Sequence, residues 1–302
     1  MNNVNYDLFG NVIKKDVILR DKFIEPPFSV LDTKTANWQR RKKLWKSLGI
    51  KSEVGRNVIG QKQTNQKNTI RINNQKYQEG FYSEPNVNDN LYVSIFDPAL
   101  CEIIYHWFCK DGGHILDPFA GGSVRGIVAN KLGYKYTGVE LRQEQVDSNR
   151  NQGLDILEID NQPQWYVGDS NKVLDDFQKE FDLVFSCPPY ANLEVYSDLE
   201  GDISNMNYEN FLSAYESIIR KSCNLLKEGG FACFVVGEVR DKNGDYIGFV
   251  SDTINAFKKC GMKYYNEAIL LNAIASASMR ANGNMKSKKL VKVHQNILIF
   301  KK

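Results

Sequence analysis

From about residue 98 onward, short apolar runs alternate with helix-like segments, and this alternation constrains the fold more than any other feature of the sequence. Strands that alternate with helices pair in parallel, with helices on both faces of the sheet. The last two runs lie close together without a clear helix between them, which indicates an antiparallel hairpin at one sheet edge. The sequence therefore predicts an α/β fold with a mostly parallel sheet of seven strands. The expected strands are 115–116, 136–139, 165–167, 181–185, 231–236, 264–271 and 295–300, and the expected helices are 99–109, 124–132, 143–152, 208–226 and 249–259, the fourth ended by Gly229 and Gly230.

Residues 1–90 differ from residues 91–302, because they are rich in Asn, Gln and Lys and lack sustained strand patterns. A basic helix that carries tryptophans is expected to begin at Trp38. It is either a solvated surface helix followed by a polar loop or a contact with nucleic acid. We therefore predict a basic extension at 1–90 and the main domain at 91–302. Further cations of the extension are Lys46, Lys51, Arg56, Lys62, Lys67, Arg71 and Lys76.

Composition indicates an ordinary globular protein of 302 residues, with 42% hydrophobic residues and a net charge of only +3. That charge is too small to indicate a nucleic-acid partner by itself. The six cysteines form no metal-ligand spacing, so buried free thiols in a reducing compartment are expected and no metal is predicted. Residues 1–16 lack the apolar core of a signal peptide, and no segment is apolar enough to cross a membrane. We expect a cytoplasmic protein.

Three acidic residues stand at the ends of three successive expected strands: Asp117, Glu140 and Asp169. Ligands of doubly wound sheets bind at the carboxyl ends of strands, and a glycine-rich turn such as 117–123 lets the backbone approach a ligand closely. One carboxylate could accept both hydroxyls of a ribose, and another the amino group of an adenine. Any single acid could instead cap a helix. A dinucleotide is disfavoured, because G-x-G-x-x-G is absent and Asp117 would meet a pyrophosphate, whereas carboxylates suit the cationic groups of S-adenosylmethionine.

The fourth expected strand ends in Ser186-Cys187-Pro188-Pro189-Tyr190. Two prolines make a loop rigid and remove two backbone donors, so its carbonyls can accept hydrogen bonds from a substrate amine. The tyrosine ring can stack on a flat base. Beside a bound methyl donor, such a loop suits an exocyclic amine as the nucleophile, although a proline turn that merely closes a strand is the alternative.

The sequence resembles the amino-group DNA methyltransferases, which modify adenine-N6 or cytosine-N4. Their cofactor motif D-P-F-x-G-[SG]-G is similar to residues 117–123, their catalytic motif [DNS]-P-P-[YFW] to residues 187–190, and their last strand to residues 294–300. The segments 25–32, 121–126 and 235–240 resemble the orphan DNA methylases of phages and prophages. The resemblance implies a Rossmann-like class I methyltransferase sheet that uses S-adenosyl-L-methionine to modify DNA in a site-specific way.

The resemblance also implies roles for individual residues. Asp117, Phe119 and Gly121 would hold the methionine end of the cofactor, Glu140 the ribose and Asp169 the adenine. The complete expected cofactor set is Phe96, Asp97, Asp117, Pro118, Phe119, Gly121, Gly122, Glu140, Leu141 and Asp169. In the catalytic set Cys187, Pro188, Pro189 and Tyr190, the first two would orient the amine and the tyrosine would stack on the base. Methyl transfer would be a direct displacement at the sulfonium, on a base flipped out of double-stranded DNA.

One residue departs from the family pattern: Cys187 stands where the family has Asp, Asn or Ser, and a thiol is a weak acceptor. A thiolate nucleophile for carbon-5 methylation is disfavoured, because that family places its cysteine after the prolines. Two rival functions stay open: methylation of an RNA base or of a protein glutamine, and DNA binding by a relative that does not catalyse transfer. The target base, the recognition sequence, a companion restriction enzyme and the oligomeric state are left open.

A second basic region lies between the last two expected strands, and from Ile269 onward the sequence contains no acid at all. Lysines that contact phosphates would give DNA binding its salt dependence. Residues 192–207 form either a loop that closes over the flipped base or an irregular surface loop. The cations of the second region are Arg280, Lys286, Lys288, Lys289 and Lys292, and the acids Asp182, Glu194, Asp198, Glu200 and Asp202 are expected near the catalytic loop.

Overall fold

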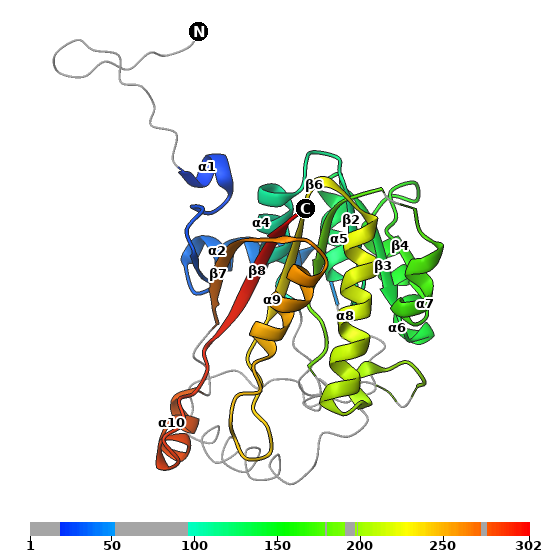
Figure 1. Ribbon diagram of the computed structural model, residues 1–302. Coiled ribbons are helices and arrows are strands. Elements are labelled where there is room, and N and C mark those ends of the chain that lie inside the picture. The colour runs from blue at the N-terminus through cyan, green and yellow to red at the C-terminus, as the bar shows by residue number, and fades with distance from the viewer. Residues whose placement is uncertain (1–18, 52–95, 179, 191–196, 198, 273–276) are drawn as a thin grey trace, which may run out of the picture.

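The computed structural model describes residues 19–51, 96–178, 180–190, 197, 199–272 and 277–302. Within these residues, eight strands form one sheet with the order β1-β7-β8-β6-β5-β2-β3-β4 (Figure 1). The strands are β1 (Val30–Asp32), β2 (His114–Asp117), β3 (Lys135–Glu140), β4 (Gln164–Val167), β5 (Phe181–Ser186), β6 (Leu226–Val236), β7 (Lys263–Leu271) and β8 (His294–Lys301). The mostly parallel α/β sheet is confirmed, with β8 as the antiparallel strand between β6 and β7.

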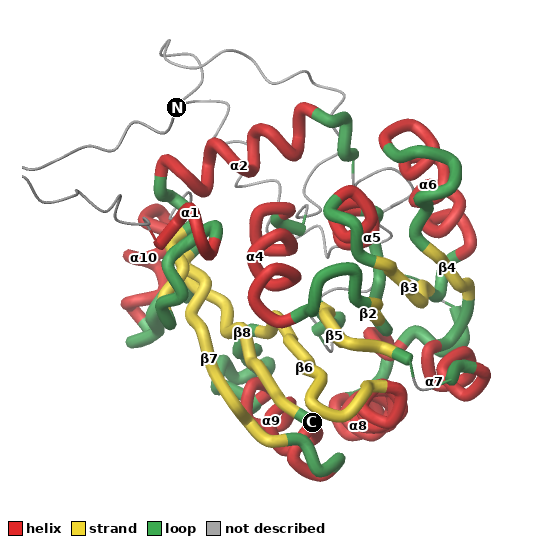
Figure 2. The backbone as a smooth tube through the Cα atoms, turned by 90° about the horizontal axis from the view of Figure 1, so that it is seen from above, coloured by secondary structure: helices red, strands yellow, loops and turns green. Residues whose placement is uncertain are grey.

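Helices cover both faces of the sheet, as Figure 2 shows in the view from above. One face carries α2 (Ala36–Ser47), α4 (Pro98–Phe108), α5 (Val124–Lys131) and α6 (Gln143–Ile156), and the other carries α7 (Ser170–Val173), α8 (Tyr208–Leu225) and α9 (Phe249–Lys259). Neighbouring residues of β2 belong to different cores, since Ile115 packs with the first layer and Leu116 with the second. A strand buried on both faces reads as a continuous apolar run rather than an alternating one. The remaining helices are α1 (Leu19–Phe23), α10 (Ala277–Lys286) and the short 3-10 turns Leu174–Asp176 and Ile203–Asn205.

The strand count predicted from the sequence was one too low, because β1 comes from the amino-terminal extension. Val30 of β1 pairs with Ile269 of β7, so this three-residue strand forms the sheet edge, and the antiparallel hairpin lies one strand further in. A run of three residues is too short to show the alternation by which strands are recognised. The structure also adds α10 between β7 and β8, where no clear helix was expected.

Gly229 does not end α8, contrary to the sequence prediction. Strand β6 begins at Leu226, directly after the helix, and Gly229 lies within it with a φ of 77°. The register shifts here, because Phe181 pairs with Leu226 whereas Leu183 pairs with Phe231. A positive φ, which glycine adopts at little cost, serves such an irregularity in a strand as well as it serves a helix cap.

The strand order fixes the edge at which a ligand can bind. From β2 the chain moves outward to β3 and β4 on one side, and to β5 and β6 on the other. Ligands of doubly wound sheets bind at such a reversal, beyond the carboxyl ends of the strands. Because β8 is antiparallel to both β6 and β7, the carboxyl end of β7 lies at this same edge, and so does α10 (Figure 1). None of the helices among the described residues combines the length and apolar character of a membrane span.

Candidate active site

Asp117, at the end of β2, joins four elements of the fold through its buried carboxylate. Its side chain is fully buried, and Oδ1 accepts a hydrogen bond from Ser186 Oγ at 2.6 Å. Oδ2 accepts from Arg125 Nε at 2.5 Å and from Tyr136 Oη at 2.8 Å. Burial, followed by the charge of Asp117, raises the pKa of Tyr136, which therefore remains a neutral donor. This carboxylate ties the glycine-rich turn after β2 to the proline loop after β5.

Arg125, in the first turn of α5, holds the backbone of the glycine-rich turn. Its Nη2 donates to the carbonyls of Phe119 at 2.7 Å and Ala120 at 2.8 Å. Its guanidinium carbon lies 4.6 Å from the ring centroid of Phe96, within the range of a cation–π contact. Burial alone would lower the pKa of Arg125, but the charge of Asp117, the neighbouring Tyr136 and Cys187, and the hydrogen bond to Asp117 together outweigh it, and the pKa is raised. Arg125 thus stays charged and links the turn to Phe96.

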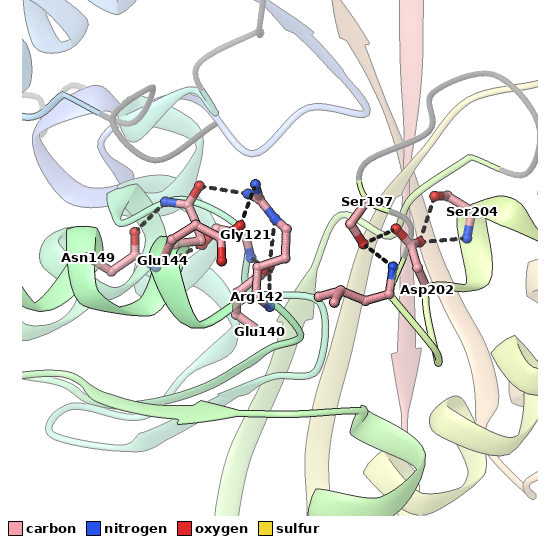
Figure 3. Close-up of polar contacts among 10 residues, drawn as sticks. Gly121, Glu140, Arg142, Glu144, Asn149, Ser197, Asp202 and Ser204 are labelled. Atoms are coloured by element: carbon pink, nitrogen blue, oxygen red, sulfur yellow. Dashed lines mark hydrogen bonds and ion pairs between the residues drawn. The ribbon is translucent and has the colours of Figure 1, made fainter. Parts of the chain in front are cut away.

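A closed ring of hydrogen bonds fixes the next part of the turn (Figure 3). Gly121 N donates to Glu140 Oε2 at 3.0 Å, and Arg142 N donates to Glu140 Oε1 at 3.1 Å. Arg142 Nη2 donates to Gln145 Oε1 at 3.0 Å, and Gln145 Nε2 donates to Asn149 Oδ1 at 2.9 Å. The ring closes where Asn149 Nδ2 donates to the Gly121 carbonyl at 2.7 Å. Both backbone groups of Gly121 are therefore held in place.

Gly121 has a φ of 54°, in the left-handed region that favours glycine. Its hydrogen bonds hold this turn against the end of β3, where the Glu140 side chain is half-buried. The ring orients that carboxylate beside the turn. A carboxylate in this position suits a ribose, whose two hydroxyls are donors.

Asp169, two residues beyond β4, caps the short helix α7, because its Oδ1 accepts from Asn171 N at 2.8 Å. The capping role that the sequence left open for a single acid is thus present here. The next residue, Ser170, donates from Oγ to the Pro118 carbonyl at 2.6 Å, which brings Asp169 beside the glycine-rich turn. Gly201 covers it from the other side, since a Cβ at Gly201 would lie 3.3 Å from Asp169 Cβ.

The proline loop follows β5, which pairs directly with β2. Pro188 is buried, and Cys187 is half-buried as a free thiol. The Tyr190 hydroxyl accepts from Gln295 Nε2 of β8 at 3.2 Å, and its ring meets Phe249 edge-on at 5.8 Å. The two turns thus leave adjacent parallel strands at the same edge, as the sequence-based interpretation requires.

The residues predicted from the sequence differ in exposure in a way that fits a site. Asp117, Pro118 and Pro188 are buried beneath it. The other eleven are half-buried: Phe96, Asp97, Phe119, Gly121, Gly122, Glu140, Leu141, Asp169, Cys187, Pro189 and Tyr190. Since both Asp117 oxygens are taken by protein donors, the structure shows this side chain supporting the turn, and its direct contact with the methionine end stays a prediction.

Residues 14–151 match the family model described as DNA methylase, of the N6/N4 type. The match contains the glycine-rich turn and Glu140, and it ends before Asp169 and the proline loop. Somewhat less than half of the chain is therefore similar to the N6/N4 DNA methylase family. The match also runs across the predicted boundary at residues 90 and 91, which lies outside the described residues.

Several solved structures are similar to the chain. TrmN from Thermus thermophilus is 13% identical over 68% of this chain and 49% of its own, with a TM-score of 0.44. A TehB-like S-adenosylmethionine-dependent methyltransferase from Corynebacterium glutamicum is 15% identical over 78% and 97%, with a TM-score of 0.42. TTHA0409, also from Thermus thermophilus and provisionally named a DNA modification methylase, is 26% identical over 45% and 52%, with a TM-score of 0.35. The chain thus spans about half the length of TrmN and of TTHA0409. No curated protein sequence matches the chain.

The amino-terminal helix α2 is anchored next to this site. Trp38 Nε1 and Lys42 Nζ both bind Asp97 Oδ2, at 3.1 and 2.9 Å, and Arg41 Nη1 binds Glu102 Oε1 at 2.7 Å. Asp97 in turn caps α4 by accepting from Ala99 N. One face of the basic helix therefore packs inward, with Trp38 and Trp45 buried, whereas Lys51 ends the described part of the extension and its later cations lie outside it.

The acids expected near the catalytic loop do not form one cluster. Asp182 lies at the amino end of β5, opposite the site, where Lys227 and Lys110 pair with it and lower the pKa of its carboxyl despite partial burial. Asp202 is buried and accepts hydrogen bonds from Ser197 and Ser204 (Figure 3). Glu194 and Asp198 lie outside the described residues, as do the other residues of 192–196, whereas 197 and 199–207 of the 192–207 loop are described.

Sequence reasoning missed several residues that shape the site, and a signal existed for some of them. Gln145 and Asn149 are four residues apart on a helix that looks polar throughout, and such spacing places them on one face. Arg125 is a charged residue in the first turn of a helix that otherwise begins with apolar residues. Ser186 and Gln295 gave no local signal. The missed residues are Arg125, Tyr136, Arg142, Gln145, Asn149, Ser186 and Gln295.

Replacing Asn149 by alanine is expected to weaken binding of S-adenosylmethionine about tenfold. The substitution removes the donor to the Gly121 carbonyl and the acceptor of the Gln145 amide, and a buried group that loses its partner costs about 1–3 kcal/mol. Titration calorimetry of the purified protein would measure the affinity. Asn151, exposed on the same helix, provides the control, since N151A should bind normally. Equal affinities for N149A and N151A would contradict the role of the ring.

Proposed function

We propose that the chain transfers a methyl group from S-adenosylmethionine to the exocyclic amino group of adenine or cytosine in double-stranded DNA. The observation that carries this proposal is the hydrogen bond of 2.6 Å between Ser186 Oγ and Asp117 Oδ1. It joins the two turns that the function needs, one for the methyl donor and one for the amine. The similarity of residues 14–151 to the DNA methylase family model supports DNA as the substrate.

The donors around the glycine-rich turn fit S-adenosylmethionine. Glu140 and Asp169 are half-buried carboxylates beside a turn whose backbone is fixed, and they suit ribose hydroxyls and an adenine amino group. Phe119 and Gly121 would lie along the methionine end. What the cofactor supplies when bound is a methyl group on a positively charged sulfur. The protein contributes position and orientation, which lower the barrier of a direct displacement.

The proline loop would bind the target base. The Pro188 carbonyl and the Cys187 sulfur would accept hydrogen bonds from the amine and direct its lone pair at the methyl carbon. As the new N–C bond forms, the C–S bond breaks, and the amine then loses a proton to solvent. The Tyr190 ring would stack on the base, which compensates part of the cost of flipping it out of the duplex.

Parallel assays with labelled S-adenosylmethionine would test the function. Duplex DNA, RNA and total protein would be offered separately, and labelled DNA would be digested to nucleosides and separated by chromatography. We expect label in DNA alone, as N6-methyladenine or N4-methylcytosine. Label in RNA or in protein glutamine would overturn the proposal, as would 5-methylcytosine. DNA binding without transfer would indicate the non-catalytic relative.

The two substitutions Cys187→Asp and Cys187→Ala are expected to change kcat in opposite directions. A carboxylate accepts a stronger hydrogen bond than a thiol, by about 1 kcal/mol, so C187D should raise kcat about fivefold. C187A removes a weak acceptor and should lower kcat by about fivefold or less. Single-turnover methylation would measure both. Complete loss of activity in C187A would instead point to a sulfur nucleophile.

A cytoplasmic location accompanies this function, since DNA is the proposed substrate. The six cysteines are free thiols, four of them buried, which suits a reducing compartment. The resemblance of the segment 235–240 to orphan methylases supports a phage or prophage origin.

A further inference from the structure

The segment 277–292, which we call the arm, projects from the same sheet edge as the proposed active site (Figure 1). It consists of α10 and the residues that lead into β8. Because the carboxyl ends of β7, β5 and β2 lie at one edge, the arm lies at the same sheet edge as the turns that carry Asp117 and Cys187. Strand direction thus determines the sheet edge at which the arm lies.

The surface of the arm is cationic. Arg280, Lys286 and Lys288 are exposed, and none of them forms an ion pair with another described residue. The sequence from Ile269 to Lys302 contains no acid that could neutralise them. Three large apolar side chains are exposed as well: Met279, Met285 and Leu290. Unpaired cations of one sign over a continuous stretch are the electrostatic footprint of a nucleic-acid surface.

A second loop braces the arm. Lys289 Nζ donates to the Asn243 carbonyl at 3.3 Å. That carbonyl belongs to the turn 240–246, in which Arg240 stacks on the Tyr246 ring at 3.8 Å and donates to the Gly244 carbonyl at 2.7 Å. The carboxylate of Asp241 is engaged by the backbone of the same turn, through Asn243 N and Asp245 N. The arm is therefore held against the turn 240–246 of the same chain through Lys289.

The base of the arm reaches the proline loop. Gln295, three residues beyond it, donates to the Tyr190 hydroxyl at 3.2 Å. A Cβ built on Gly237 would lie 3.7 Å from Lys292 Nζ and 3.5 Å from Tyr190 Oη. DNA held by the arm would therefore lie next to the residue proposed to stack on the flipped base.

We infer that the arm binds the phosphate backbone of duplex DNA next to the flipped base, through Arg280, Lys286 and Lys288. This inference rests on the proposed function and specifies where its substrate is gripped. An acidic protein is the other partner that such a charge could attract. The position of the arm at the active-site edge, with its base at Tyr190, favours the DNA that must reach the proline loop.

The test compares two double variants of the full chain. K286A/K288A removes two exposed lysines of the arm, and K131A/K135A removes two exposed lysines at the end of α5 and the start of β3, at the opposite sheet edge. Fluorescence anisotropy with a labelled duplex would be measured across a series of salt concentrations. Each lost phosphate contact lowers the slope of log affinity against log salt by about one unit. We expect K286A/K288A to lower the slope by about two units, and the control to keep it.

Two further measurements separate the possible failures. Calorimetry with S-adenosylmethionine should give the same affinity for both variants and the natural chain, because the arm is not assigned to the cofactor. If the natural chain methylates DNA and K286A/K288A keeps the salt slope of the natural chain, the arm inference is overturned and the proposed function is left intact. The same unchanged slope with loss of methyl transfer would also overturn it. A natural chain that transfers no methyl to DNA would overturn the proposed function itself, whatever the arm variants do.

Discussion

Replacement of Arg125 by methionine is expected to destabilise the protein by about 3–5 kcal/mol, because it leaves the buried Asp117 carboxylate without its charged partner. The substitution also removes the donors to the Phe119 and Ala120 carbonyls. Urea denaturation would measure the free energy of unfolding. Arg220, exposed on α8, supplies the control, since R220M should change that free energy by less than about 0.5 kcal/mol.

Two additional variants distinguish loss of folding from loss of function. In the double variant D117N/R125M both charges are absent, so part of the stability lost in R125M should return. R125K keeps the charge but not the planar fork that reaches two carbonyls, and it should weaken cofactor binding more than DNA binding. A cost below about 1 kcal/mol for R125M would contradict the central role of this pair.

The second large effect is expected at Tyr190. Y190A removes the ring proposed to stack on the flipped base, a contact worth about 1–3 kcal/mol, so kcat/KM for DNA should fall by about 10- to 100-fold. Y190F keeps the ring and loses the hydroxyl that accepts the hydrogen bond from Gln295 Nε2 at 3.2 Å, so its kcat/KM should fall by less than about tenfold. Initial rates of methyl transfer to duplex DNA would measure both.

The variant Q295A is a control for the two tyrosine variants. Q295A removes the same hydrogen bond from the other side and should match Y190F. Cofactor affinity should be unchanged in all three variants, because the ring lies at the proline loop. If Y190F and Y190A were equally impaired, the hydroxyl and not the ring would be the important group. If Y190A kept its full kcat/KM, Tyr190 would not contact the base.

Local pattern was enough to predict most helices and strands of residues 98–302. Apolar runs buried on both faces, such as 181–185, are dense enough in sequence to be recognised singly. The three acids and the proline turn were recognisable because each directly follows such a run. Chain direction in a parallel sheet then brings those ends to one edge, so the position of the site followed from the order of elements.

Pairing between segments that are far apart in the sequence determined the remaining strand and the contacts of the site. Strand β1 exists only because Val30 meets Ile269, and Gln295 reaches Tyr190 only after β8 inserts between β6 and β7. Asp117 accepts hydrogen bonds from side chains of three other elements, α5, β3 and β5, up to 69 residues away in sequence. Its position at a strand end was readable from the sequence. The support that it gives to the turn depends on which donors packing brings within 3 Å of it.

The sequence by itself determined the alternation of elements, the residues at the strand ends and the acid-free run of the arm. The tertiary structure alone decided the Arg125–Asp117 pair, the ring from Glu140 to Asn149, and the place of the arm beside Tyr190. The physical reason is the distance along the sequence over which each interaction acts. Periodicity and turn chemistry act over a few neighbouring residues, whereas a buried hydrogen bond forms only where the register of non-adjacent strands brings donor and acceptor together.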